Sequence, residues 1–421
     1  MTCFMAMILD QENAPRIALE VGQLAIADRH DHLEGSLVDA EPHRGDDRLA
    51  VGIVERDRGW RRRVEQRLGG VGGLGELHRH RLLGFDALHR VAAETLTSEQ
   101  ARASEAAYTR VAPTIGGLMR TLEIGLVLPM GESFVDGSTA RWVDIRDLAI
   151  RAEEIGFDTV WTADELLWRP ADGETHGWWE CVAMTGAVAA ATSSVKVGTW
   201  ILSALHRNPG ITAKAVETLD EISGGRFVFG LGSGHAGRQG HTFGLPEDHV
   251  YGRFQEALEI IVPLLRKGRA DFEGTFHAAR DLEHRPVGPR AGGIPIMIGA
   301  KGPKMLRLAA LYADIWSWYV EERSDLAEFG PRLVALEATC VEAGRDPATI
   351  GKSAGIVVEP TAFTGSAAVL GAPIQGSAEQ IADGLRAFGA AGFTNLELLV
   401  WPPTLVTLDA MAPVLELLDA D

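Results

Sequence analysis

Titratable residues follow short apolar runs at several points of the sequence. Asp164 and Glu165 come directly after one such run, His206 follows the next, and His235 follows a third. An imidazole titrates near neutral pH and a neighbouring carboxylate can orient it, so these residue types suit general acid–base chemistry. Each residue also has an ordinary structural explanation, because carboxylates cap helices and loop histidines form simple hydrogen bonds. Convergence on one site would favour the chemical interpretation.

Two glycine-rich segments end other apolar runs. Gly232, Gly234 and Gly237 have the spacing of a dinucleotide-binding fingerprint, but that fingerprint requires a helix that opens at the glycines. Here a helical pattern begins only near Asp248, so we interpret the glycines as a loop at a strand end, where a flat ligand can rest against backbone. Gly299 to Pro303 is a second glycine turn, which opens a helix and suits a phosphate or a ring edge.

Strands and helices that could position these residues alternate from Met119 onward. The expected strands are Leu122 to Pro129, Asp158 to Thr162, Val195 to Ser203, the run around Phe227, Ile294 to Gly299, Asp314 to Trp318, Ser353 to Val358 and Leu396 to Val400. The expected helices are Arg141 to Ile155, Trp178 to Ala191, Gly210 to Ile222, Tyr251 to Lys267, Lys304 to Tyr312, Leu326 to Ala343 and Ser377 to Ala390. Eight strands over 303 residues (421 minus 118) predict an α/β fold, a (β/α)8 TIM barrel with insertions, the main one at Arg269 to Gly293. The site of such a barrel lies at the C-terminal ends of its strands.

Residues 1–118 differ from the rest in composition. They contain fifteen arginines, no lysine and six histidines, without a sustained apolar period. We interpret them as an unrelated N-terminal extension that is poorly ordered or not natively translated, which leaves residues 119–421 as the barrel domain. The alternative is a metal hydrolase, because His30 with His32 and His78 with His80 form His-x-His pairs, although neither pair follows a convincing strand.

Overall composition limits the classes of partner. A formal net charge of −18 disfavours nucleic acid and anionic membrane surfaces as partners. Three widely separated cysteines, Cys3, Cys181 and Cys340, fit neither a zinc spacing nor a disulfide framework, so the cytoplasm is the expected location and no metal is expected. No apolar run has the length of a membrane span.

Several motifs in this order resemble the luciferase-like monooxygenase family, and within it the branch that uses the deazaflavin coenzyme F420. The motifs are Gly156-Phe-Asp-Thr-Val-Trp-Thr-Ala-Asp164, Val197-Gly-Thr-Trp-Ile-Leu-Ser203, His206-Arg-Asn-Pro209, Thr218-Leu-Asp-Glu-Ile-Ser-Gly-Gly-Arg226, Ile294-Pro-Ile-Met-Ile-Gly-Ala-Lys-Gly-Pro303 and the late segment Gly376 to Arg386. The resemblance covers Met119 to about Trp401 and does not include residues 1–118.

The resemblance implies an oxidoreductase that transfers hydride between coenzyme F420 and a small organic substrate. In such a site we predict His235 as the general acid or base, because an imidazole titrates near neutral pH, with Asp164 as its catalytic partner or as a hydrogen-bond partner of the ring. Trp168 and His206 are the predicted substrate contacts. The resemblance also implies a non-proline cis peptide between Trp200 and Ile201. The implied cofactor-binding residues are Asp164, Glu165, Trp200, Ile201, Ser203, Gly234, His235, Gly299, Ala300, Lys301 and Gly302. Glu165 replaces a histidine of the deazaflavin-dependent sugar-phosphate dehydrogenases, and no match to their phosphate-binding lysines is found, so the substrate stays open.

Two other functions remain possible on the same barrel. One is an FMN-dependent monooxygenase that uses oxygen and a separate flavin reductase as partner. The other is a flavin-binding barrel without catalytic activity. The resemblance further implies a homodimer.

Overall fold

The computed structural model describes residues 120–133, 137–169, 175–234, 238–290, 293–360 and 371–420. The predicted extension 1–118 lies outside the described residues, as do His235 and the two His-x-His pairs. The prediction that residues 1–118 form a separate part of the chain therefore stays a prediction.

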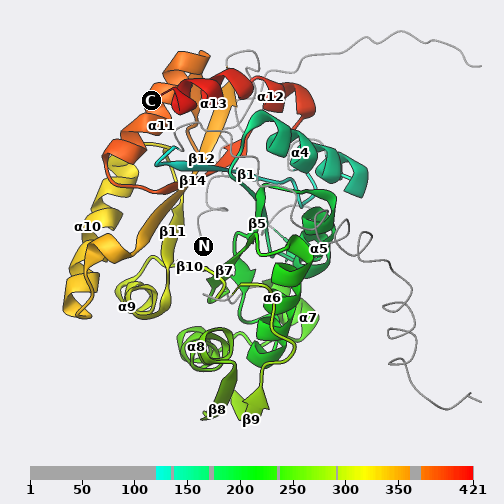
Figure 1. The fold of residues 1–421 in the computed structure, drawn as a ribbon, viewed down its shortest axis with the longest axis vertical. Coiled ribbons are helices and arrows are strands. Elements are labelled where there is room, and N and C mark those ends of the chain that lie inside the picture. Colours follow the sequence, from blue (N-terminus) through cyan, green and yellow to red (C-terminus); the bar gives the residue numbers. More distant parts are fainter. Residues whose placement is uncertain are drawn as a thin grey trace, which may run out of the picture. The chain divides into compact units, whose positions relative to one another are not determined.

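Eight parallel strands close into a barrel (Figure 1). The strands are β1 (Glu123–Val127), β2 (Thr159–Thr162), β5 (Lys196–Thr199), β7 (Phe227–Gly232), β10 (Ile296–Gly299), β11 (Ile315–Tyr319), β12 (Gly351–Pro360) and β14 (Asn395–Val400). Around the barrel they follow chain order, and β7 pairs with β10 as well as with β5, while β14 pairs with β1 to complete the ring. The predicted (β/α)8 barrel is confirmed.

Helices surround the strands, because each connection between parallel strands needs a crossover (Figure 1). Local sequence fixes their ends. In α6, for example, the Asn208 side chain accepts hydrogen bonds from the first backbone amides, Pro209 starts the helix and Gly224 ends it in the left-handed region. The helices are α4 (Trp142–Ile155), α5 (Cys181–Ala191), α6 (Pro209–Ser223), α8 (Val250–Lys267), α9 (Pro303–Tyr312), α10 (Leu326–Glu342), α11 (Ala378–Ala390), α12 (Leu405–Asp409) and α13 (Ala412–Asp419), with a 3-10 turn at Pro347–Thr349.

Several short elements interrupt this pattern. The predicted insertion holds the antiparallel hairpin of β8 (Arg269–Glu273) and β9 (Ala278–Glu283). A smaller hairpin, β3 (Leu167–Trp168) with β4 (His176–Gly177), follows β2. The other short elements are β6 (Leu202–Ser203), β13 (Ile374–Gly376) and α7 (Arg238–Phe243).

Two sequence expectations need correction here. The expected single strand Val195 to Ser203 is broken into β5 and β6, with Trp200 and Ile201 between them. The expectation that no helix begins between the glycine loop and Asp248 is wrong, because α7 lies there. A helix of six residues is too short to show a helical period in the sequence.

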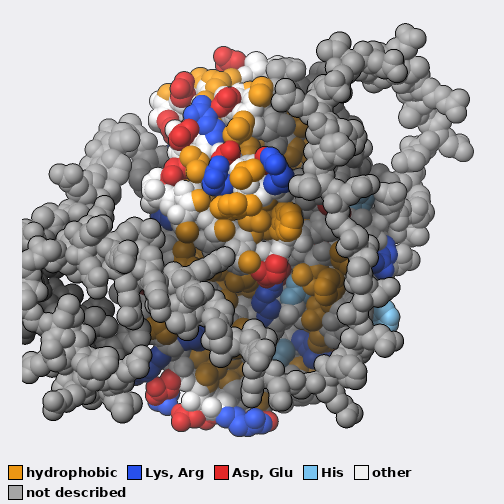
Figure 2. Space-filling model, turned by 90° about the vertical axis from the view of Figure 1, so that its right-hand side faces the viewer, with side chains coloured by type: hydrophobic (Ala, Val, Ile, Leu, Met, Phe, Trp, Pro, Cys, Tyr) orange, Lys and Arg blue, Asp and Glu red, His pale blue; other side chains and the backbone are white. Residues whose placement is uncertain are grey.

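A tryptophan fills the middle of the barrel. Trp161 is 2% exposed and packs with Val228 and Met297. A Cβ atom at Gly125 or Gly198 would lie closer than 3.0 Å to its ring, so the two neighbouring strands need glycine there to admit the indole. On the side of the described chain shown in Figure 2, hydrophobic side chains cover much of the middle, with acidic and basic side chains among them and others at the upper and lower ends. Within the described parts of the chain, no helix is long and apolar enough to cross a membrane.

Candidate active site

A cavity of about 1380 Å³ opens where the barrel strands end. Its lining comes mainly from the C-terminal ends of β1, β7, β10, β11 and β14 and from the segments that follow β1, β2, β5, β7, β10 and β14, which is the position expected for the site of a barrel of this kind. Most of the predicted site residues line it together, namely Asp164, Glu165, Trp168, Trp200, Ile201, Ser203, His206, Gly234, Gly299, Lys301 and Gly302.

Two predicted site residues, Ala300 and His235, are not among the described residues that line the cavity. Ala300 is 1% exposed and does not appear in the lining; its amide donates to Ser317 O over 3.2 Å and its carbonyl accepts from Trp316 Nε1 over 2.8 Å. His235 lies outside the described residues, so its predicted catalytic role stays a prediction.

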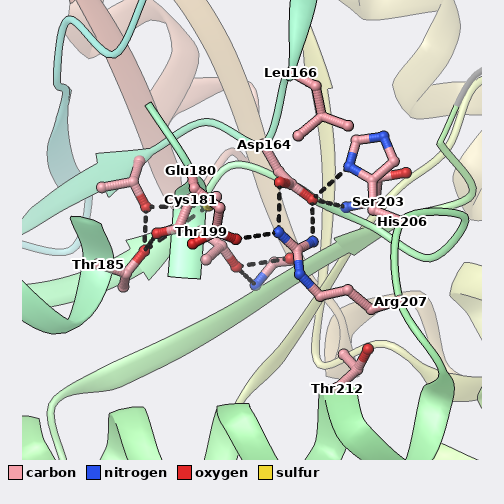
Figure 3. A network of polar contacts seen from close by, with 12 residues as sticks. Asp164, Leu166, Glu180, Cys181, Thr185, Thr199, Ser203, His206, Arg207 and Thr212 are labelled. Atoms are coloured by element: carbon pink, nitrogen blue, oxygen red, sulfur yellow. Dashed lines mark hydrogen bonds and ion pairs between the residues drawn. The ribbon is translucent and has the colours of Figure 1, made fainter. Parts of the chain in front are cut away.

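Asp164 is the centre of a buried polar network (Figure 3). Its Oδ2 accepts from the Ser203 amide over 2.8 Å and from Arg207 Nη1 over 2.6 Å, while Oδ1 accepts from Arg207 Nη2 over 3.0 Å. His206 Nδ1 lies 3.2 Å from Oδ2. A bidentate ion pair between a guanidinium and a carboxylate is both strong and directional. Through Arg207, Asp164 therefore holds the end of β2 against the segment that follows β5.

The same network keeps Asp164 ionised. Burial alone would raise its pKa, but the contacts with His206 and Arg207 outweigh burial and hold the pKa of Asp164 below its ordinary value. Arg207 also donates to Glu180, over 2.5 Å, and these two carboxylates raise the pKa of its guanidinium despite burial. A carboxylate with such partners stays charged near neutral pH and does not exchange protons there.

Glu165 has the opposite electrostatic environment. It lines the cavity, and among its contacts Gln239 Nε2 donates to its Oε1 over 3.0 Å, while Gln239 Oε1 accepts from the Leu166 amide over 3.0 Å. Burial and the adjacent charge of Asp164 raise the pKa of Glu165 to about 8, against a lowering by the Gln239 hydrogen bond. Glu165 can therefore gain and lose a proton close to neutral pH.

The peptide bond between Trp200 and Ile201 is cis, as the resemblance predicts. Trp200 Nε1 donates to Ser317 Oγ over 3.1 Å, and its ring meets Tyr319 edge to face at 6.4 Å between centroids. Ile201 borders the cavity between two glycines, since a Cβ at Gly232 or Gly299 would lie closer than 3.0 Å to Ile201 Cδ1.

A polar chain leads from Trp200 into the barrel. Ser317 Oγ lies 3.4 Å from Ser353 Oγ, which in turn donates to Glu397 Oε2. Glu397 is fully buried on β14, and burial raises its pKa to about 7. This row of polar side chains could not be predicted from the sequence, because Ser317, Ser353 and Glu397 lie on three separate strands.

Lys301 and the start of α9 form the cationic part of the lining. Gly302 caps α9 without a side-chain hydrogen bond, and nothing lies within 4 Å of where its Cβ would be, so the helix start faces open space. Lys301 Nζ pairs with Glu321 and lies 5.4 Å from the centroid of the Trp318 ring. Backbone amides at a helix N-terminus together with a lysine can bind a phosphate.

An apolar wall, which we define as Met130, Trp168, Trp178, Trp401 and Leu405, lines another part of the cavity. Of these five residues, only Trp168 was predicted to contact a ligand. Trp401 and Leu405 follow the eighth barrel strand, so the rule that every strand end borders the site could have found them. In the described part of the chain, no group of three His, Cys, Asp or Glu side chains is placed to hold a metal ion.

Some known proteins are similar to this chain in sequence, and others are similar in fold. The F420-dependent glucose-6-phosphate dehydrogenase of Beutenbergia cavernae is 34% identical over 178 residues, which are 41% of this chain and 51% of that protein. The 5,10-methylenetetrahydromethanopterin reductase of Archaeoglobus fulgidus is 36% identical over 166 residues, 39% of this chain and 45% of that protein. The chain thus spans about half the length of these curated relatives.

Among solved structures, an F420-dependent secondary alcohol dehydrogenase in complex with an F420-acetone adduct superposes with a TM-score of 0.58. It is 20% identical in sequence, and the match covers 70% of this chain and 98% of that one. At this identity the match shows a shared fold. The luciferase-like monooxygenase family matches residues 122–364, more than half of the sequence, and the chain belongs to this family.

Proposed function

We propose that the protein is an oxidoreductase that binds coenzyme F420 and transfers hydride between this deazaflavin and a small organic substrate. The observation that carries the proposal is the glycine-bordered part of the cavity around Ile201, which suits a flat ring. Gly232 and Gly299 give Ile201 the room to stand beside it, and a side chain on either would intrude there. The names of the relatives support the choice of cofactor.

Other residues fit the polar parts of such a cofactor. Ser203 Oγ is buried, lines the cavity and has no hydrogen-bond partner among the described residues, so a polar ring edge would satisfy it. Lys301 and the start of α9 would hold a phosphate of the cofactor side chain. When bound, the deazaflavin supplies the hydride acceptor or donor, while the protein supplies orientation and one proton carrier.

Glu165 suits the proton carrier better than Asp164 does. A general acid or base works best when its pKa lies near the operating pH, and the pKa of Glu165 is raised to about 8. Asp164 instead positions Ser203 and Arg207 through its ionised carboxylate. The catalytic role of His235 stays a prediction. Substitution of Glu165 and of His235 in turn, with measurement of the hydride-transfer rate, tests which residue is the acid or base.

Titration of the purified full chain with oxidised F420, reduced F420 and FMN tests the proposal directly. We expect a saturable change in the ring absorbance of both deazaflavin forms, and weaker binding of FMN. Tighter binding of FMN, with oxygen consumption after its reduction, would favour the monooxygenase instead. Tight binding of F420 without turnover of any alcohol or carbonyl compound would favour the non-catalytic barrel.

The homodimer, the cytoplasmic location and a flavin reductase partner remain predictions. Sedimentation of the purified protein measures the first of these. A reductase is needed only if FMN proves to be the cofactor.

A further inference from the structure

A polar row of four side chains leads from the cavity into the barrel; its members are Trp200, Ser317, Ser353 and Glu397. Trp200 Nε1 donates to Ser317 Oγ over 3.1 Å. Ser353 Oγ lies 3.4 Å from Ser317 Oγ and is also hydrogen-bonded to Glu397 Oε2. Trp200 and Ser317 line the cavity, whereas Ser353 and Glu397 are fully buried. The row therefore joins a carboxyl inside the barrel to a hydroxyl at the cavity wall.

The charge of Glu397 determines the direction of the hydrogen bonds in this row. Ser353 has a single hydrogen for two neighbouring oxygens, Ser317 Oγ and Glu397 Oε2. An ionised Glu397 receives this hydrogen, because a hydrogen bond to a carboxylate is the stronger one. Ser317 accepts from the indole of Trp200, which can only donate, and it then donates its own hydrogen to Ser353. In this state the Ser317 hydrogen is not available to a ligand.

A protonated Glu397 reverses the direction. The carboxyl hydrogen is donated to Ser353, and the hydrogen of Ser353 is donated to Ser317. Ser317 Oγ then accepts from both of its neighbours, and no acceptor in the row remains for its own hydrogen. Because Ser317 lines the cavity, this hydrogen can be donated to a ligand there.

The surroundings of Glu397 make its protonated form accessible. Its Oε1 has no hydrogen-bond partner among the described residues, so the ionised carboxylate is poorly compensated for its burial. Burial raises the pKa of Glu397 to about 7, although the hydrogen bond from Ser353 acts to lower it. Both charge states are therefore populated near neutral pH.

Other titratable side chains of the barrel supply no countercharge to Glu397. On the eight barrel strands these side chains are Glu123, Lys196, Tyr319, Lys352 and Glu359. The charge of Glu123 raises the pKa of Glu397 further. Lys196 is paired with Glu123, and Lys352 is paired with Glu337 of α10. Neither lysine of the strands is thus an ion-pair partner of Glu397.

We propose that Glu397 is a positioning residue that determines, through Ser353, whether Ser317 donates a hydrogen bond to a ligand in the cavity. The inference rests on the proposed function, because we take this ligand to be the ring of F420. The edge of a deazaflavin ring carries more acceptor atoms, its carbonyl oxygens among them, than N–H groups. F420 should therefore bind more tightly when Glu397 is protonated, and its binding should in turn favour protonation of Glu397.

Infrared spectroscopy of the full chain without cofactor tests the first step. Difference spectra between about pH 5 and about pH 9 detect the C=O stretch of a protonated carboxyl. We expect a band that disappears as the pH rises through about 7 and that is absent from Glu397→Gln. Glu123→Gln, which removes a charge that raises the pKa of Glu397, should shift this transition to lower pH. A spectrum that Glu397→Gln leaves unchanged would overturn the inference whether or not F420 binds.

The affinity for oxidised F420 tests the second step. Glu165 also titrates in this range, so the comparison is made in chains that carry Glu165→Gln. Between about pH 6 and about pH 9, the Kd should rise about fivefold more than in the chain that also carries Glu397→Gln, the effect of one hydrogen bond. Ionisation of the cofactor itself affects both chains alike, so the difference between them is the measured quantity.

Ser317→Ala separates the two steps. It leaves the pair of Ser353 and Glu397 in place, so the infrared band should still titrate, while the contribution of Glu397 to the F420 affinity should disappear. A contribution that survives Ser317→Ala, or an affinity that rises with pH only when Glu397 is present, would contradict the inference. Failure of F420 to bind would defeat the proposed function and with it the ligand assigned to Ser317. Tight binding of F420 that is independent of Glu397 would defeat this inference alone.

Discussion

Asp164 and Glu165 are neighbours in sequence, yet their carboxylates have opposite electrostatic surroundings. Burial acts to raise the pKa of Asp164, but its contacts with His206 and Arg207 outweigh burial and lower it. Burial and the neighbouring charge of Asp164 raise the pKa of Glu165 to about 8, although the hydrogen bond from Gln239 acts to lower it. Two neighbouring carboxylates with such different pKa values can have different roles: Asp164 supplies a fixed negative charge, and Glu165 can transfer a proton.

Glu165→Gln should slow substrate oxidation by about 100-fold or more, the usual contribution of one general base. Oxidation needs the ionised form, so the wild-type rate should rise with pH towards about 8 and the variant should lose this dependence. Stopped-flow measurement of F420 reduction between pH 6 and about 9 checks both effects. Glu154→Gln, on the exposed face of α4, serves as the control.

Gln239→Leu tests the proposed role of Glu165 by a change in its pKa. The hydrogen bond from Gln239 lowers the pKa of Glu165, so its removal should move the rise in rate to higher pH. An unchanged pH profile in both variants would assign the proton transfer to another group, of which His235 is the predicted one.

The positions of these residues could be predicted from sequence, but their charge states could not. Strand ends and barrel topology bring Asp164, Glu165 and His206 to one rim. The partner Arg207 lies 43 residues from Asp164, and Gln239 lies 74 residues from Glu165. Such pairings depend on side-chain geometry in the folded chain, which no sequence period encodes.

At the scale of elements, glycines in β7 and β10 leave room for Ile201, which follows β5. The sequence indicated a glycine loop for ligand contact, and Gly232 and Gly234 do line the cavity. It gave no account of Gly230, which lies inside β7, because a glycine within a strand shows its purpose only when the neighbouring backbone is known.

Gly230→Ala should destabilise the protein by about 3 kcal/mol or more. Its Cβ would lie closer than 3.0 Å to the Thr199 carbonyl oxygen, a backbone atom that cannot rotate away. Gly302→Ala is the matched control for stability, because nothing lies within 4 Å of its Cβ position. Urea unfolding of both variants measures the difference. Similar loss of free energy in the two would contradict the packing argument.

For the whole molecule, Glu397 makes stability depend on pH. Its pKa is raised from 4.5 to about 7 by burial, so the folded state binds a proton more tightly than the unfolded state does. This contribution to stability is fully present below the unfolded pKa near 4.5 and is lost as pH rises through about 7. The shift corresponds to about 3 kcal/mol.

Glu397→Gln should remove that part of the pH dependence. The amide keeps the shape of the side chain and can still accept from Ser353 Oγ. The free energy of unfolding of the wild type should therefore fall more steeply than that of the variant between pH 5 and about 7. Denaturant unfolding at several pH values makes the comparison. Parallel curves would indicate that Glu397 does not titrate in this interval.

The N-terminal boundary can also be tested on the whole chain. Arg120 is the first described residue, and its side chain, 7% exposed, donates to Asp158 over 2.9 Å and to Gly156 O over 2.6 Å, and pairs with Asp419 at 3.2 Å. A chain that begins at Met119 keeps these bonds, so its Tm and its affinity for F420 should equal those of the full chain. A chain that begins at Thr121 should lose about 2 kcal/mol, because Asp158 is left without its charged donor. Thermal unfolding of the three chains decides the matter: if the chain from Met119 is as unstable as the chain from Thr121, then residues 1–118 belong to the fold.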